Sequence, residues 1–227
     1  MSTTIPANKS GPRATKLTVQ IWSDVICPFC PIGDRRFQKA LGQFAGRDQV
    51  EIVYRSYRLQ PGVAPHSIDE YLANKFGAHQ KAAPILQQVS HIAAQEGLTY
   101  RLEDTLVGDT LNAHRLLHLA LTVGKHKALV ERFYRSYFTE HANLFDRNSL
   151  LHLAVEAGLD EADTAAVLDS ERFTAEVDAD QKEAHRLGIR SVPHFLIGKR
   201  ISVSGSMAPA EFLAALNRAR DARAVPA

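Results

Sequence analysis

Long apolar runs, cysteines and an excess of one charge are what this sequence has least of. No apolar run approaches the ~20 residues that a membrane-spanning helix needs, so we expect no membrane partner. The chain has 27 lysine and arginine residues against 25 aspartate and glutamate residues, a net charge of +2. This balance gives no electrostatic reason to expect a nucleic-acid partner. With 45% hydrophobic residues, the 227-residue chain can bury a core without disulfide bonds.

The first sixteen residues also lack the apolar segment of a secretion signal. They are polar, contain Pro6 and Pro12, and are interpreted as a disordered leader over 1–16. Without a secretion signal we expect a soluble, cytoplasmic protein, in a reducing compartment where structural disulfides rarely persist. The chain's two cysteines, Cys27 and Cys30, therefore need a chemical explanation.

The pattern around these cysteines predicts a β-α-β unit. Residues 17–22 alternate and include β-branched residues, which favours a strand that ends shortly before Cys27. Apolar residues then recur at helical spacing over 32–44, and 50–57 has the pattern of a second strand. We expect a right-handed crossover between two parallel strands, with the cysteine pair at the strand-to-helix junction.

Residues 67–187 have a helical pattern almost throughout. The expected helices, most of them followed by a glycine, span 67–76, 80–96, 110–123, 126–141, 148–157, 161–169 and 172–187. Two strand-like segments follow at 194–197 and 200–203, and Gly198 predicts a hairpin between them. A last helix is expected from Ala208 to about Arg220.

This order of elements, β-α-β, a helical block and then β-β-α, predicts an α/β fold whose core is split by an insertion. The expected core domain covers 17–61 and 188–220, and the expected all-helical insertion domain covers 62–187. Pro61 and Gly62 mark the boundary near residue 61 clearly. The boundary near residue 188 is less clear.

Cys27 and Cys30 enclose Pro28 and Phe29 in a C-x-x-C motif at the entrance of the expected helix. Cysteines at this spacing can form and break a disulfide with little backbone movement. Unpaired amides and the positive end of the helix dipole favour a thiolate at Cys27. Pro28 suits the first helical position because it has no amide hydrogen. We therefore expect Cys27 to be the nucleophile and Cys30 to resolve the mixed disulfide.

The alternative to redox chemistry is half of a structural zinc site. Such a site needs four ligands, and the chain has no second cysteine pair. His114 and His118, four residues apart on one helical face, would complete it only if two distant elements converged. We expect no metal and interpret the cysteines as a redox-active pair.

Two separated stretches carry a resemblance to a known family. Residues 23–33, SDVICPFCPIG, and residues 188–195, GIRSVPHF, resemble the DsbA-like thioredoxin superfamily, and within it the cytoplasmic FrnE-like branch. Shorter matches at 71–77, 112–116 and 203–205 follow in the family's order. The resemblance implies a thioredoxin-like fold with a large all-helical insertion, and a thiol-disulfide oxidoreductase.

The resemblance also implies roles for two loops. The family has a cis peptide bond at the position of Val192–Pro193, beside the sulfurs, and binds an extended peptide through the backbone there. This implies that Val192 and Pro193 bind substrate, together with Pro28 and Phe29. Outside the family, a trans proline that opens a strand is the alternative.

Three features depart from the family's pattern. Phe29 stands where tryptophan is common and where periplasmic relatives often have histidine, so we expect a less strongly oxidising site. Pro31 replaces a common tyrosine and stiffens the first helical turn. The chain also lacks the second cysteine pair that some FrnE-like proteins have near the C-terminus, so no extra thiol relay is expected.

Other polar and aromatic residues have two interpretations each. The resemblance to glutathione-dependent enzymes of the superfamily implies that Asn112 faces Cys27; otherwise Asn112 makes a local hydrogen bond. Asp24 is either a turn residue or a carboxylate that modulates the thiols. An aromatic cluster at helical spacing is expected to make core or homodimer contacts rather than to stack on a ligand; its members are Phe133, Tyr134, Tyr137 and Phe138.

Three functions are compatible with these features. The first is a dithiol-disulfide oxidoreductase, with disulfide isomerase as a variant, acting on thiol- or disulfide-containing proteins or small molecules. It would use a redox-active disulfide, no bound cofactor, and glutathione as a co-substrate. The second is a glutathione-dependent isomerase or transferase similar to 2-hydroxychromene-2-carboxylate isomerase or the kappa class, in which serine commonly replaces Cys27. The third is a holdase for unfolded protein. The intact cysteine pair favours the first.

Overall fold

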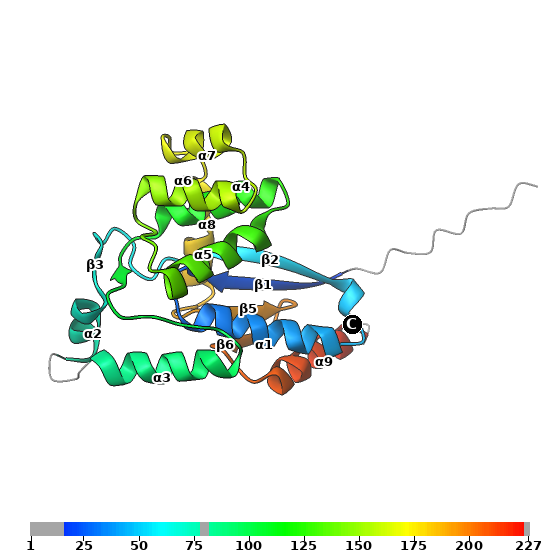
Figure 1. The fold of residues 1–227 in the computed structure, drawn as a ribbon. Helices are drawn as coiled ribbons and strands as arrows, with labels where there is room; N and C mark the ends of the chain where they lie inside the picture. The colour runs from blue at the N-terminus through cyan, green and yellow to red at the C-terminus, as the bar shows by residue number, and fades with distance from the viewer. Residues whose placement is uncertain (1–15, 78–81, 225–227) are drawn as a thin grey trace, which may run out of the picture.

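The computed structural model describes residues 16–77 and 82–224, and it contains the β-α-β unit that the sequence predicts (Figure 1). Its elements, in chain order, are β1 (Leu17–Ser23), α1 (Phe29–Gln43), the short 3-10 helix η1 (Arg47–Gln49) and β2 (Val50–Ser56). β1 and β2 pair in parallel, with Leu17 opposite Val50. Cys27 and Cys30 therefore lie just beyond the carboxyl end of β1, a central strand.

The central sheet has four strands in the order β2-β1-β5-β6. β5 (His194–Ile197) and β6 (Ile201–Ser204) form the predicted antiparallel hairpin, and β5 also pairs antiparallel with β1. Gly198 has a φ of 63°, which suits a glycine in so tight a turn. α9 (Pro209–Ala224) then packs with α1 on one face of the sheet (Figure 1). The predicted β-β-α end of the core is confirmed.

Between β2 and β5 the chain is almost entirely helical. The helices there are α2 (Ile68–Phe76), α3 (Ala82–Gln95), α4 (Leu111–Thr122), α5 (His126–Glu140), α6 (Arg147–Glu156), α7 (Glu161–Leu168) and α8 (Thr174–Arg186). Each corresponds to one predicted helix, although residues 80 and 81 of the second prediction lie outside the described residues. The periodicity missed a two-stranded ladder of β3 (His66–Ser67) and β4 (Leu106–Val107), since two residues are too few to show a period.

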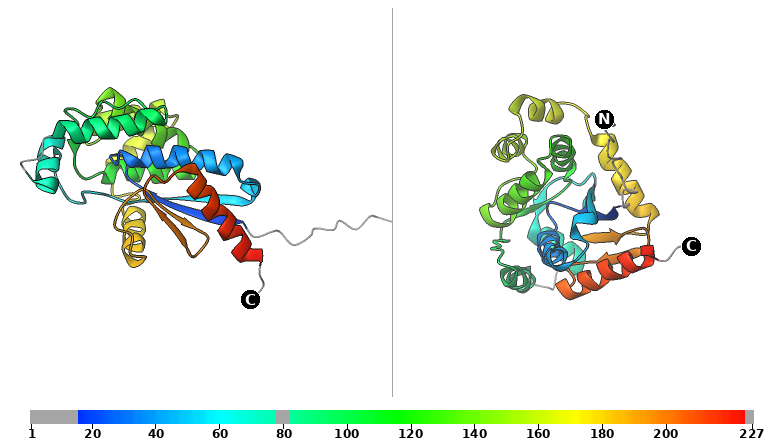
Figure 2. Two further views of the ribbon diagram at one scale, coloured as in Figure 1. Left: turned by 90° about the horizontal axis from the view of Figure 1, so that it is seen from below. Right: turned by 90° about the vertical axis from the view of Figure 1, so that its right-hand side faces the viewer.

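α8 lies against the sheet, on the face opposite α1 (Figure 2). Successive residues of β1 point to opposite faces, so Ile21 packs with α1 and α9 while Trp22 packs with Ala184 of α8. The carboxylate of Asp180 forms an ion pair with Arg55 at 2.9 Å. These contacts join the last helix of the expected insertion directly to the core sheet.

The expected division into 17–61 plus 188–220 and 62–187 stays a prediction. The expected leader, 1–16, lies outside the described residues except for Lys16.

Three apolar clusters fill the part of the chain that the structure describes. One lies between the sheet and α1 and α9 and is centred on the rings of Phe37, Phe195 and Phe212. The largest fills the helical part and includes Phe133, Tyr137 and Phe138, so the core interpretation of the aromatic cluster is confirmed. The third surrounds the cysteines, with these members: Trp22, Cys27, Cys30, Tyr57, Ala184, Ile189 and Val192.

Candidate active site

The cysteine motif occupies the turn between β1 and α1. Cys27 donates its backbone N–H to the carbonyl of Asp24 at 3.2 Å, and Cys30 donates to the carbonyl of Cys27 at 3.0 Å. α1 begins at Phe29, so Pro28, with φ −66°, is the capping residue. The sequence placed Pro28 one position too late, as the first helical residue, because its fixed φ fits both positions. The predicted strand-to-helix junction is confirmed.

Both cysteines are free thiols with little exposed surface. Cys27 is 4% exposed and Cys30 is 1% exposed. The Sγ atom of Cys27 donates to the carbonyl of Val192 at 3.4 Å. The Val192–Pro193 bond is cis, as the resemblance implied. Residues 165 positions apart are therefore neighbours, and the backbone of the 192–193 loop faces the sulfur of Cys27.

The surroundings of Cys30 favour its protonated, neutral form. Burial raises the pKa of the Cys30 thiol well above its ordinary value, and the neighbouring Cys27 raises it further. In the reduced protein, where both cysteines are free, Cys30 therefore stays a neutral thiol. A buried neutral thiol suits the expected resolving role, because a resolving thiol loses its proton only in the second step of exchange.

Phe29, between the cysteines, is 36% exposed and leaves an apolar ring at the surface beside the sulfurs. The half-buried Pro28 completes this wall. Such a surface beside a dithiol suits contact with apolar parts of a substrate.

Two tyrosines from the helical part reach the motif. The sequence pattern indicated Tyr134 only as a member of the aromatic cluster and gave no signal for Tyr100. Tyr100 donates its hydroxyl to the carbonyl of Pro28 at 2.8 Å and stacks on Phe138 with ring centroids 4.6 Å apart. Burial raises the pKa of Tyr134 well above its ordinary value, and negative charge on Cys30 would raise it further. Both hydroxyls are therefore neutral hydrogen-bonding groups beside the cysteines.

Asp24 is completely buried and connects the motif with the helical part. Its Oδ2 accepts the backbone N–H of Leu59 at 2.7 Å, and its Oδ1 lies 3.3 Å from Nε2 of His114 on α4. Asp24 thus does more than form a turn, since it joins the Cys27 loop to another element.

Asn112 makes a local hydrogen bond, which is one of the two interpretations that the sequence left open. It is exposed, and its side-chain oxygen accepts a hydrogen bond from Arg115 at 2.9 Å. A role for Asn112 in substrate binding stays a prediction.

The histidines considered as zinc ligands have other partners. His118 Nε2 lies 3.2 Å from both the Ser56 hydroxyl and the Asp180 carboxylate, and His114 contacts Asp24. Residues 16–77 and 82–224 contain no group of three or more histidine, cysteine or acidic residues that could hold a metal ion.

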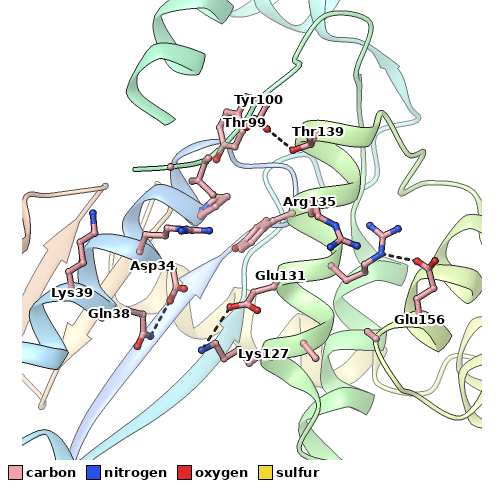
Figure 3. A pocket seen from close by; sticks show the side chains of 18 residues that line it. Asp34, Gln38, Lys39, Thr99, Tyr100, Lys127, Glu131, Arg135, Thr139 and Glu156 are labelled. Carbon is pink, nitrogen blue, oxygen red and sulfur yellow. Dashed lines mark hydrogen bonds and ion pairs between the residues drawn. The ribbon is translucent and has the colours of Figure 1, made fainter. Parts of the chain in front are cut away.

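Two large cavities flank the motif. A cleft of 1060 Å³ lies between α1, the 97–100 loop and α5, with many charged residues on its walls (Figure 3). A second cavity, of 760 Å³, is bordered by Tyr57 and Leu59, which pack around the cysteines, and carries Lys75 and Arg190. Both volumes are of the size that small ligands occupy in proteins.

A four-stranded sheet with a C-x-x-C pair at a strand-to-helix junction and a cis proline beside it defines a thioredoxin-like redox protein. Residues 18–217 match the model of the DSBA-like thioredoxin domain, and the chain belongs to this family. The predicted thioredoxin-like fold with a helical insertion is thereby confirmed, as is a thiol-disulfide oxidoreductase at the general level.

Known proteins are similar over most of the chain. The crystal structure of a "probable DsbA oxidoreductase SCO1869" from Streptomyces coelicolor is 41% identical, with a TM-score of 0.88 over 93% of this chain and 92% of that one. An uncharacterized protein, YwbO from Bacillus subtilis, is 26% identical over 81% of this chain and 88% of its own. The cytosolic disulfide reductase DsbM from Pseudomonas aeruginosa shares the fold at 18% identity, with a TM-score of 0.61 over 92% of this chain and 97% of its own, and has also been solved with GSH.

The described helices include none that is both long and apolar enough to cross a membrane.

Proposed function

We propose that this protein exchanges disulfides with protein or small-thiol substrates through Cys27 and Cys30. The observation that carries the proposal is the position of the Cys27 sulfur, at the helix entrance and 3.4 Å from the carbonyl of Val192. A substrate chain that pairs with the 192–193 backbone would bring its own sulfur next to Cys27. Pro28 and Phe29 would form the wall of this groove.

The exchange proceeds in two balanced steps. In the reducing direction, the Cys27 thiolate attacks one sulfur of a substrate disulfide, the S–S bond breaks, and one substrate thiolate leaves. Cys30 then loses its proton and attacks the Cys27 sulfur, which releases the second substrate thiolate and leaves a Cys27–Cys30 disulfide. Two electrons pass from the protein to the substrate. The oxidising direction, and disulfide isomerisation, use the same steps in other orders.

Glutathione is the small thiol that we propose as co-substrate. The 760 Å³ cavity is lined by two basic residues, Lys75 and Arg190, and one acidic residue, Glu70, and its positive charges suit the carboxylates of a small peptide. The fold relative DsbM, solved with GSH, also supports this choice. The same relative, named a cytosolic disulfide reductase, supports a cytoplasmic location for this protein. A homodimer stays a prediction.

The proposal is tested by the reduction of insulin disulfides with dithiothreitol as electron donor. The wild-type protein should accelerate reduction, Cys27→Ser should abolish the acceleration, and Cys30→Ser should accumulate a mixed disulfide with substrate that a gel without reductant shows. Asp48→Asn, which changes a side chain 94% exposed and remote from the motif, serves as the control and should keep the wild-type rate.

Equal activity in the two cysteine variants would contradict the proposal. If both kept a glutathione-dependent activity, the protein would belong with the isomerases and transferases of the superfamily. If both prevented aggregation of unfolded protein and neither exchanged disulfides, the holdase alternative would replace it.

A further inference from the structure

The second step of the proposed exchange needs a base, because Cys30 must lose its proton to attack. Cys30 is 1% exposed, and burial raises the pKa of its thiol. Bulk water therefore cannot take the proton directly. The partner of Cys27, the carbonyl of Val192, is not a base. Cys30 therefore needs a proton acceptor among the groups around its own thiol.

Cys30 borders a small cavity of 30 Å³. This volume accommodates about one or two water molecules. Its walls come from β1, α1, β2, α5 and β5, through these residues: Ile21, Ser23, Cys30, Asp34, Tyr54, Lys127, Val130, Glu131, Tyr134, Pro193 and Phe195. Asp34 lies four residues after Cys30 on α1, so the two side chains lie on the same face of the helix.

The small cavity and the 1060 Å³ cleft share part of their walls. Four residues, Asp34, Lys127, Glu131 and Tyr134, line both. Figure 3 shows Asp34 on α1 and Glu131 on α5 reaching into the cleft from opposite walls. Asp34 thus stands between a buried thiol and an open, charged cleft.

We propose that Asp34 is the proton acceptor for Cys30, through water in the cavity that the two residues share. The inference rests on the proposed disulfide exchange and adds a catalytic residue to it. During resolution the Cys30 S–H proton passes through water to the Asp34 carboxylate as the Cys30–Cys27 bond forms and the substrate thiolate leaves. The proton then reaches solvent through the cleft between α1 and α5. In the reverse reaction Asp34 returns the proton to Cys30.

The surroundings of Asp34 suit a base for a thiol. Burial raises the pKa of Asp34 above its ordinary value and outweighs the hydrogen bond from Gln38, which is 3.4 Å long. A carboxylate with a raised pKa binds a proton more strongly, which brings it closer to the thiol that it must deprotonate. The other groups that face Asp34 are Arg35 on its own helix, Tyr54 on β2, and Lys127, Glu131 and Tyr134 on α5.

Asp24 is the competing carboxylate, and it lies close enough to Cys30 for its negative charge to raise the pKa of that thiol. Its oxygens already accept from the backbone of Leu59 and lie against His114, within a fully buried site. Asp24 borders neither the cavity of Cys30 nor the cleft. A proton on Asp24 would therefore enter neither of these two cavities.

Stopped-flow reaction of the reduced protein with 5,5′-dithiobis(2-nitrobenzoate) separates the two steps. Attack by Cys27 releases the first thionitrobenzoate, and attack by Cys30 on the mixed disulfide releases the second, each seen by its absorbance. Asp34→Asn should leave the first release unchanged and slow the second about 100-fold near neutral pH. The deficit should shrink as the pH rises, because hydroxide then deprotonates Cys30 without help.

Two further variants make the test specific. Asp34→Glu keeps a carboxyl group and should recover most of the rate of the second release. Glu51→Gln removes an exposed carboxylate from β2, away from the cavity, and should match the wild-type protein.

The outcomes separate the inference from the function on which it rests. Failure of the wild-type protein to release even the first thionitrobenzoate would overturn the disulfide exchange itself. A normal first release with an unchanged second release in Asp34→Asn would overturn the role of Asp34 alone. So would an Asp34→Glu variant as slow as Asp34→Asn, or an Asp24→Asn variant that slows the second release while Asp34→Asn does not.

Discussion

Cys30 and Asp34, one helical turn apart on α1, are affected by burial in the same direction. Burial raises the pKa of the thiol and the pKa of the carboxyl group, so both groups hold protons more tightly than they would in water. A buried carboxylate that is only weakly paired costs folding free energy. Asp34 therefore lowers stability where it stands, a cost that its proposed role as a proton acceptor would explain.

This cost predicts that Asp34→Asn stabilises the protein at pH 7. The folded pKa of Asp34 is raised above the ordinary value of 3.8, so the unfolded chain loses this proton first and stability falls as the pH rises through that window. Asparagine has no such proton, so the variant should have the higher free energy of unfolding at pH 7. The gain should vanish below pH 3.8, where both states hold the proton. Urea unfolding at both pH values measures it.

Asp48→Asn is the matched control for that measurement, since the Asp48 side chain is 94% exposed. It should change the free energy of unfolding by less than about 0.5 kcal/mol at either pH. A destabilised Asp34→Asn variant at pH 7 would mean that the carboxylate is better paired than its contacts indicate.

Some residues of the candidate site could be predicted from the sequence, and others could not. Cys27 and Cys30 form a local motif, and Val192 and Pro193 were found through the resemblance of two separated stretches. Asp34 sits among charged residues of an ordinary helix, and only the fold shows that its side of α1 faces a cavity. Tyr100 reaches Pro28 across 72 residues of sequence, so no local pattern could reveal it.

At the scale of elements, periodicity predicted the helices well because each buries one stripe along its length. It assigned α8 to the insertion, since α8 continues a run of helices in sequence. Besides the apolar contact of Ala184 with Trp22, a buried carboxylate of α8 ties the helix to β2. Asp180 accepts hydrogen bonds from Arg55 and from the backbone of Ser56, both at 2.9 Å. α8 is thereby fixed against the edge strand β2.

Asp180→Asn should therefore destabilise the protein by about 2 kcal/mol at pH 7. Burial alone would raise the pKa of Asp180, but hydrogen bonds from His118, Ser56 and Arg55 outweigh it and lower this pKa below 3.8. A lowered folded pKa contributes stability above the ordinary value, and the contribution is lost as the pH falls through the folded value. The deficit of the variant, measured by urea unfolding, should thus shrink in acid.

Asp178→Asn is the control on the same helix. Asp178 pairs with Arg58 at 2.9 Å, but its side chain is 41% exposed, so solvent screens the pair. We expect a loss of less than about 1 kcal/mol. An Asp180→Asn variant as stable as Asp178→Asn would show that the buried carboxylate does not hold α8 to the sheet.

At the scale of the whole molecule, the chain order of the elements indicated a core and an insertion, but not how tightly they are joined. Three contacts between distant segments meet at the active site or on α1: Tyr100 with Pro28 at 2.8 Å, His114 with Asp24 at 3.3 Å, and Glu96 with Arg36 at 2.7 Å. Together with α8 on the sheet, they connect both predicted parts through the residues that carry the chemistry. Movement of the helical part would therefore disturb the cysteine loop.

These connections predict that the reduced protein unfolds in one cooperative transition. Trp22 is the single tryptophan and is fully buried between the sheet and α8, so its fluorescence reports the core. Far-ultraviolet circular dichroism reports mainly the helices, most of which lie between β2 and β5. Urea curves from the two signals, recorded with dithiothreitol present, should coincide, and Asp180→Asn should shift both by the same amount. Loss of helix at lower urea than loss of the Trp22 signal would instead mean that residues 62–187 unfold as an independent domain, and that the contacts at the active site are too weak to couple it to the sheet.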